Sequence, residues 1–155
     1  MTTYRLAVVG GGNMGAALVG GLLHSGWAAA DLAGVEVLTA RADQLREMFP
    51  GVNVVDETPP CEAALIAVKP YDVAAACGAA ANAGATRLLS IAAGIAIAAL
   101  QDAAGPEVAV VRAMPNTPAL VGQGAAAICG GLTAGDADLA WAESILGSVG
   151  SVVRV

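Results

Sequence analysis

The chain has 155 residues, of which 57% are hydrophobic and 13% are charged, and its formal net charge is −6. This length and composition predict one domain, residues 1–155, with a buried core, and exclude intrinsic disorder. The seven Lys and Arg residues stand singly along the sequence, which argues against a nucleic-acid partner. The longest weakly polar run, residues 88–100, is too short to cross a bilayer, so we expect no membrane partner.

Short runs rich in Val, Ile and Leu alternate with Ala-rich stretches along the whole sequence. We expect strands near residues 4–9, 34–39, 52–55, 64–68, 86–91, 108–112, 124–129 and 151–154. We expect helices near residues 13–25, 41–48, 70–80, 96–103 and 134–146. Alternation of strands and helices, with continuously apolar strands, predicts an α/β fold. The expected architecture is Rossmann-like: a doubly wound, mostly parallel sheet with helices on both faces.

The first predicted strand leads into a glycine-rich segment, Gly10-Gly-Gly-Asn-Met-Gly15, and an apolar helical stretch follows. This order of strand, tight turn and helix is typical of a dinucleotide-binding loop. Gly10 permits the sharp turn, Gly12 leaves the backbone open to a pyrophosphate, and Gly15 lets the helix pack closely. The helix then directs free N–H groups and its positive dipole end at the phosphates. Because glycines also occur in ordinary turns, the neighbouring loops have to support this interpretation.

The end of the second strand distinguishes NAD from NADP, because an acidic residue there suits a ribose 2′-hydroxyl and a basic residue suits a 2′-phosphate. Glu36 has about the right spacing, but further strand sequence follows it. We therefore place it in mid-strand or at the strand's entrance, as a solvated charge. Thr39 and Arg41 then occupy the tip, where a guanidinium fits a phosphate. This predicts NADP(H), with NAD(H) as the alternative, unless Arg41 is an ordinary surface residue.

Three later loops lie at the same predicted edge of the sheet. Lys69, the single lysine, follows the strand near 64–68 and could meet a phosphate or a ribose, or be a surface residue. The small residues around Ala93 suit either a flat ring or a crowded core. Two prolines bracket Asn116 and Thr117, which stiffens a polar loop suited to orienting a nicotinamide or a small substrate. A purely structural proline turn is the alternative for this loop.

The residues that most often carry acid–base or metal chemistry form no recognisable motif. His24 is the single histidine and is expected near the end of the first helix, where it would cap the last carbonyl groups of the helix rather than transfer protons. Cys61, Cys77 and Cys129 are far apart, which indicates reduced, buried thiols in a cytoplasmic protein without a bound metal. The catalytic residues are therefore unknown, although a bound nicotinamide could carry hydride transfer itself.

Four segments in this order resemble the N-terminal domain of pyrroline-5-carboxylate reductases. They are Gly10-Gly-Gly-Asn-Met-Gly15, Ala67-Val-Lys-Pro70, Ser90-Ile-Ala-Ala-Gly94 and Arg112-Ala-Met-Pro-Asn-Thr-Pro-Ala119. The resemblance implies reduction of 1-pyrroline-5-carboxylate to L-proline with NAD(P)H, in proline biosynthesis. The cofactor-binding residues expected from the motifs and the resemblance together are Gly10, Gly12, Asn13, Met14, Gly15, Thr39, Arg41, Val68, Lys69, Ala93 and Asn116. Asn116 and Thr117 would lie near the nicotinamide or the substrate.

Two departures from the family pattern matter. Thr58 stands where the family usually has an amide residue, and the segment 58–62 leads almost directly into the next strand. The family also has a C-terminal helical domain that forms the homo-oligomer and most of the substrate site. We expect these 155 residues, as a fragment of a longer protein or as a stand-alone relative, to lack that domain. We therefore expect a cofactor-binding domain that is inactive or weakly active alone. The alternatives are another NADP oxidoreductase of similar fold, of the F420-dependent type, or a nucleotide-binding module without catalysis.

Overall fold

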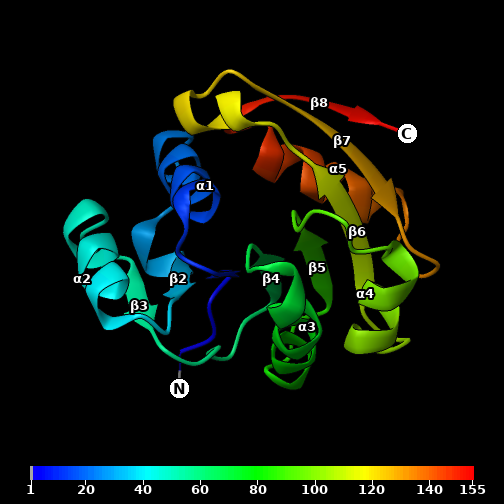
Figure 1. Ribbon diagram of the computed structural model, residues 1–155, viewed down its shortest axis with the longest axis horizontal. Helices are drawn as coiled ribbons and strands as arrows, with labels where there is room; N and C mark the ends of the chain where they lie inside the picture. The colour runs from blue at the N-terminus through cyan, green and yellow to red at the C-terminus, as the bar shows by residue number, and fades with distance from the viewer. Residues whose placement is uncertain (1) are drawn as a thin grey trace.

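A single eight-stranded sheet runs through the molecule, and helices cover both of its faces (Figure 1). The computed structural model describes residues 2–155. The strands are β1 (Leu6–Val9), β2 (Leu32–Val35), β3 (Asn53–Val55), β4 (Ala63–Ile66), β5 (Arg87–Ser90), β6 (Ala109–Met114), β7 (Gly124–Gly130) and β8 (Gly150–Arg154). The α-helices are α1 (Asn13–His24), α2 (Thr39–Met48), α3 (Val73–Asn82), α4 (Ile97–Ala104) and α5 (Asp136–Leu146). Short 3₁₀ helices are η1 (Ala29–Asp31), η2 (Pro70–Asp72) and η3 (Thr117–Val121).

The strand order is β3-β2-β1-β4-β5-β6-β7-β8. All pairs from β3 to β6 are parallel, β7 is antiparallel to β6, and β8 is parallel to β7. The chain moves outward from β1 to β3 and then returns to place β4 on the other side of β1. This reversal creates a crevice at the carboxyl ends of β1 and β4, where ligands of doubly wound sheets bind. The predicted α/β, mostly parallel fold is confirmed.

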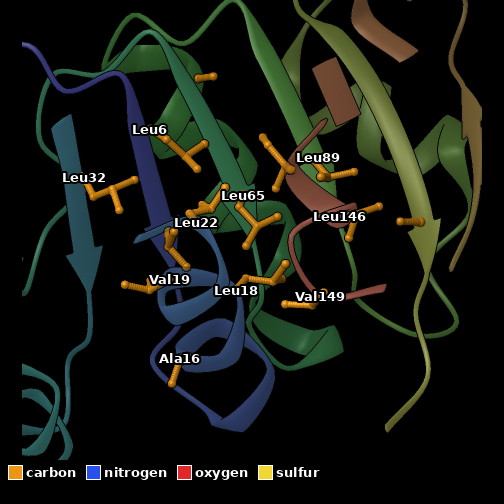
Figure 2. Packing of buried hydrophobic residues seen from close by; sticks show 14 of the residues in the cluster. Leu6, Ala16, Leu18, Val19, Leu22, Leu32, Leu65, Leu89, Leu146 and Val149 are labelled. Atoms are coloured by element: carbon orange, nitrogen blue, oxygen red, sulfur yellow. The ribbon is translucent and has the colours of Figure 1, made fainter. Parts of the chain in front are cut away.

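Successive residues of each inner strand lie in two separate hydrophobic cores, because side chains alternate between the faces of a sheet. Leu6 and Val8 of β1 pack with buried residues of α1, α2 and α5 on one face. Ala7 and Val9 pack with buried residues of α3 and α4 on the other face. Figure 2 shows the first of these clusters, including labelled side chains from α1, β4 and the segment after α5. The inner strands are thus buried on both faces, and the loops that can meet a ligand lie at their ends.

All eight predicted strands and all five predicted helices are present, with one boundary that matters for function. The strand expected at 34–39 is β2, which ends at Val35. In the register, Val35 is the last residue of β2 that pairs with β1 and with β3, so β2 ends there. Val37 and Leu38 suggested more strand, but they are 74% and 66% exposed. These two apolar residues lie on the surface of a loop rather than in a buried strand.

Two smaller outcomes concern the loops and the helices. No helix separates β3 from β4 within the described residues, as the segment 58–62 predicted. The helix expected at 70–80 is divided into η2 and α3, and the last helix begins at Asp136. Among residues 2–155, no helix has both the length and the apolar character that crossing a membrane requires.

Candidate functional site

A cleft of about 920 Å³ lies where β1, β2 and β4 end, beside the reversal of strand order. Its walls come from the glycine loop after β1, from the segment after β2, and from the segment after β4. These three strands are adjacent and parallel, so their carboxyl ends meet at one edge. The cleft therefore occupies the position at which the fold binds ligands.

The glycines of the loop are required by the geometry at two positions. Gly10 has φ = 109°, and a Cβ built on it would overlap the carbonyl oxygen of Ala67. A Cβ on Gly15 would overlap the carbonyl oxygen of Gly10, which lies directly against the start of α1. By contrast, a Cβ on Gly12 would meet nothing within 4 Å. Gly10 and Gly15 thus bring loop, strand and helix together, and Gly12 faces open space on the cleft.

The amino end of α1 opens onto the same space. Gly12 is its N-cap, no side chain among residues 2–155 caps the helix, and the first turn contains no acidic residue. The first N–H groups of a helix have no partner within the helix, and the helix dipole favours an anion there. Asn13, Met14 and Gly15 line the cleft at this end. Uncapped N–H groups next to the open face of Gly12 fit the pyrophosphate of a dinucleotide.

Glu36 follows β2 directly and lines the cleft, so the prediction that it lies in mid-strand or at the strand's entrance is wrong. Its Oε1 accepts a hydrogen bond from the N–H of Gly11 at 3.1 Å, and its Oε2 accepts one from the N–H of Leu38 at 3.1 Å. The first bond joins the β2 loop to the glycine loop, and the second turns the chain after Glu36. The carboxylate is therefore fixed at the tip of β2.

Arg41 also lines the cleft, but as the third residue of α2 rather than as the tip of the strand. Its Nε donates to the carbonyl oxygen of Gly11 at 2.5 Å, and its Nη1 donates to Oε1 of Gln44 at 3.0 Å. Thr39 is the exposed first residue of α2 and is not among the residues that line the cleft. The prediction that Thr39 and Arg41 occupy the strand tip is thus wrong, because β2 ends earlier.

The segment after β4 closes the opposite side of the cleft. Val68 and Lys69 line it, and Lys69 is an exposed residue at the N-terminus of η2. Tyr71 and Asp72 of η2 line the cleft as well, and they are not among the residues predicted from the sequence. The sequence carries no signal for these two residues, since their position depends on how η2 turns back toward β1.

The remaining predicted residues lie at the same edge of the sheet but outside the cleft. Ala93 is exposed in the turn after β5, and Asn116 and Thr117 are exposed after β6. Oδ1 of Asn116 accepts a hydrogen bond from the N–H of Ala125 at 2.9 Å, which ties the loop to β7. Of the predicted residues, the structure gathers Gly10, Gly12, Asn13, Met14, Gly15, Arg41, Val68 and Lys69 around one cleft.

Other reactive residues lie away from the cleft. His24 is exposed and ends α1, at the opposite end of the helix from the glycine loop. Burial raises the pKa of the Cys61 and Cys77 thiols to about 11, which keeps them protonated and weakly reactive. Within residues 2–155, His, Cys, Asp and Glu side chains form no group of three that could hold a metal. The lining of the cleft thus fits a dinucleotide.

Comparisons with known proteins show which proteins the chain is similar to. A pyrroline-5-carboxylate reductase from Corynebacterium melassecola is 32% identical to the chain. The match covers 100% of this chain and 60% of that reductase. The structure of a pyrroline-5-carboxylate reductase from Coxiella burnetii superposes with a TM-score of 0.89 at 27% identity, over 99% of this chain and 59% of that protein.

A more distant structure shows the same fold. It is a Plasmodium falciparum pyrroline carboxylate reductase with NADP bound, with a TM-score of 0.79 and 24% identity, over 100% of this chain and 58% of that protein. The chain thus spans about three fifths of these relatives, and the resemblance predicted from the four motifs is confirmed. The family model described as "NADP oxidoreductase coenzyme F420-dependent" matches residues 5–94, and the chain belongs to this family.

Proposed function

We propose that the chain is the dinucleotide-binding part of a pyrroline-5-carboxylate reductase, which reduces 1-pyrroline-5-carboxylate to L-proline with NAD(P)H in proline biosynthesis. The observation that carries this proposal is the extent of the similarity. The reductase from Corynebacterium melassecola matches 100% of the chain, including the loop at 112–119, whereas the broader family model ends at residue 94. An F420-dependent oxidoreductase, which the family description names, is the second candidate.

The cleft supports a nicotinamide dinucleotide as the cofactor, NADP(H) or NAD(H). The N–H groups of Asn13, Met14 and Gly15 and the open face of Gly12 would hold the pyrophosphate. Glu36 and Arg41 would lie at the adenosine ribose, because they stand at the β2 side of the cleft. When bound, the nicotinamide supplies the hydride for reduction. The family description and the NADP in the Plasmodium falciparum structure support the same class of cofactor.

The nicotinamide half of the site would lie further along the same edge. We place Ala93, Asn116 and Thr117 there, because β5 and β6 end on the same side of the sheet as β1. Oδ1 of Asn116 is occupied by the N–H of Ala125, so its Nδ2 is the group left to meet a ligand. The chain's part in the reaction is thus to bind and orient the cofactor.

The substrate site and the contacts of a homo-oligomer would lie largely in a further helical domain. This proposal is supported by exposed apolar side chains on η3 and β8, where Leu120, Val121 and Val153 are 44%, 76% and 58% exposed. A cytoplasmic location completes the proposal and is supported by the free thiols of Cys61, Cys77 and Cys129.

Two measurements test the proposal. The 155-residue chain should bind NADH or NADPH, which a titration of nicotinamide fluorescence detects, but should form little proline alone. A polypeptide of the relatives' length that contains this chain should oxidise NAD(P)H when 1-pyrroline-5-carboxylate is added. Reduction of F420 in place of 1-pyrroline-5-carboxylate would favour the second candidate. Failure of the chain to bind either dinucleotide would reject both.

A further inference from the structure

We infer that Glu36 selects the dinucleotide: the cleft favours an unphosphorylated adenosine ribose, so that NAD(H) binds more tightly than NADP(H). This inference rests on the proposed function, since it concerns which dinucleotide occupies the same cleft. It differs from the expectation that Arg41 selects NADP(H), which depended on a strand end that the structure places elsewhere.

The Glu36 carboxylate has the position and the fixed orientation that a ribose requires. Glu36 is the first residue after β2, about 20 residues beyond the glycine loop, where an acidic side chain meets the ribose hydroxyls in this fold. Its two oxygens accept from the N–H groups of Gly11 and Leu38, each at 3.1 Å. Each carboxylate oxygen can accept a second hydrogen bond. A ribose 2′-hydroxyl can therefore donate to Glu36 without breaking either existing bond.

A 2′-phosphate at the same place would be repelled. Its negative charge would lie beside the Glu36 carboxylate, and like charges in contact are strongly unfavourable at a binding site. Moving the carboxylate away would break its bond to Gly11 and so disturb the glycine loop. The phosphate would thus bind only at the expense of the loop that holds the pyrophosphate.

The charged side chains around the tip of β2 complete the comparison. Two of the five N–H groups of Arg41 already donate, Nε to Gly11 and Nη1 to Gln44, so the guanidinium is tied to the protein and offers a phosphate only its remaining N–H groups. Val37 and Leu38, which follow Glu36, have apolar and exposed side chains. Lys69 follows β4, which is separated from β2 by β1. Glu36 is therefore the charged side chain that follows β2 directly.

The test is a pair of titrations of the 155-residue chain, followed by nicotinamide fluorescence. NADH should bind roughly tenfold more tightly than NADPH, the factor expected for one charge-assisted hydrogen bond. In competition, 5′-AMP should displace NADH at lower concentration than adenosine 2′,5′-bisphosphate, which isolates the ribose end without any mutation. Equal or tighter binding of NADPH would overturn the inference and leave the proposed function standing. Binding of neither dinucleotide would overturn the proposed function and the inference with it.

A variant assigns the preference to one side chain. Glu36→Gln keeps the shape and one acceptor but removes the charge, so it should tighten NADPH binding and weaken NADH binding until the two are within about threefold. Glu47→Gln is the matched control, because Glu47 is an exposed glutamate of α2 that does not line the cleft. The control should keep the wild-type ratio. If Glu36→Gln has the same ratio of NADH to NADPH affinity as the wild type, Glu36 does not set the preference, whichever dinucleotide binds more tightly.

Discussion

Two parts of one sheet edge differ in how their loops are held. At the ends of β1 and β2 the loops bond to each other: Glu36 accepts from the N–H of Gly11, and Arg41 donates to the Gly11 carbonyl oxygen. At the ends of β5 and β6 the side-chain bonds stay local: Oγ of Ser90 accepts from the N–H of Ala92, and Oδ1 of Asn116 accepts from the N–H of Ala125 in its own hairpin. The loops of the first region are therefore bonded to each other before a ligand arrives, whereas those of the second are not. The chain thus prepares the adenosine and pyrophosphate half of a dinucleotide site more fully than the nicotinamide half.

The largest expected effect comes from breaking the backbone of the first region. Gly10→Ala should lower the free energy of unfolding by about 3 kcal/mol, because the left-handed φ and the overlap of Cβ with the Ala67 carbonyl oxygen act together. Unfolding in urea, followed by circular dichroism, measures the loss. Dinucleotide binding should disappear with it.

Gly12→Ala is the matched control for this variant. Its Cβ would meet nothing within 4 Å and its φ is −68°, so the free energy of unfolding should stay within about 0.5 kcal/mol of wild type. NADH binding should nevertheless weaken by at least about tenfold, because a methyl group then occupies the space of the pyrophosphate. Equal stability of the two variants would contradict the difference between a structural glycine and one that faces the ligand.

A smaller effect is expected from the arginine that joins the two loops. Arg41→Ala removes the donor to the Gly11 carbonyl oxygen, so the glycine loop loses a hydrogen bond that holds it in place. This should weaken NADH and NADPH binding alike, by roughly three- to tenfold. Paired titrations measure both affinities. Arg46→Ala removes another arginine of α2, one that bonds Asp43 and Val54 and does not line the cleft, and should leave both affinities unchanged. A loss confined to NADPH in Arg41→Ala would mean that Arg41 contacts a 2′-phosphate directly.

A substitution at the ends of β5 and β6 should change the free energy of unfolding more than the affinity for NADH. Asn116→Ala leaves the N–H of Ala125 without its partner and should lower the free energy of unfolding by about 1 kcal/mol. Its effect on NADH affinity should be at most about threefold, well below that of Gly12→Ala. Asn116→Asp keeps the acceptor and should retain most of the stability. A larger loss of affinity in Asn116→Ala would show that the nicotinamide half is more organised than its contacts indicate.

The same contrast explains which features the sequence could predict. The glycine loop was predictable because its requirements are local: a positive φ at Gly10 and close packing at Gly15 restrict each position to glycine. The end of β2 was not, because a strand stops where its neighbours stop pairing, and β1 and β3 are set by distant parts of the chain. The apolar Val37 and Leu38 resemble strand residues when only local composition is considered.

The position of Glu36 could not be predicted for the same reason. It contacts Gly11, 25 residues earlier, and this contact depends on how β1 and β2 are aligned. Its spacing from the glycine loop is the one signal in the sequence, and that spacing alone does not show where β2 ends. The inward bond of Asn116 likewise depends on the antiparallel return of β7, which the pattern of prolines does not reveal.

The smallest expected effect concerns the cysteines, which lie outside both regions. The thiol pKa of Cys61 and Cys77 is raised from 9.0 to about 11 by burial, so the folded state holds these protons more tightly than the unfolded state. Their contribution to stability is full below 9.0 and is lost as the pH rises through about 11. Below that window, Ellman's reagent should modify the partly exposed Cys129 first and the two buried thiols only slowly. Modification of Cys129 should leave NADH affinity unchanged, because β7 does not line the cleft; a coupled loss would mean that the two regions of the sheet edge move together.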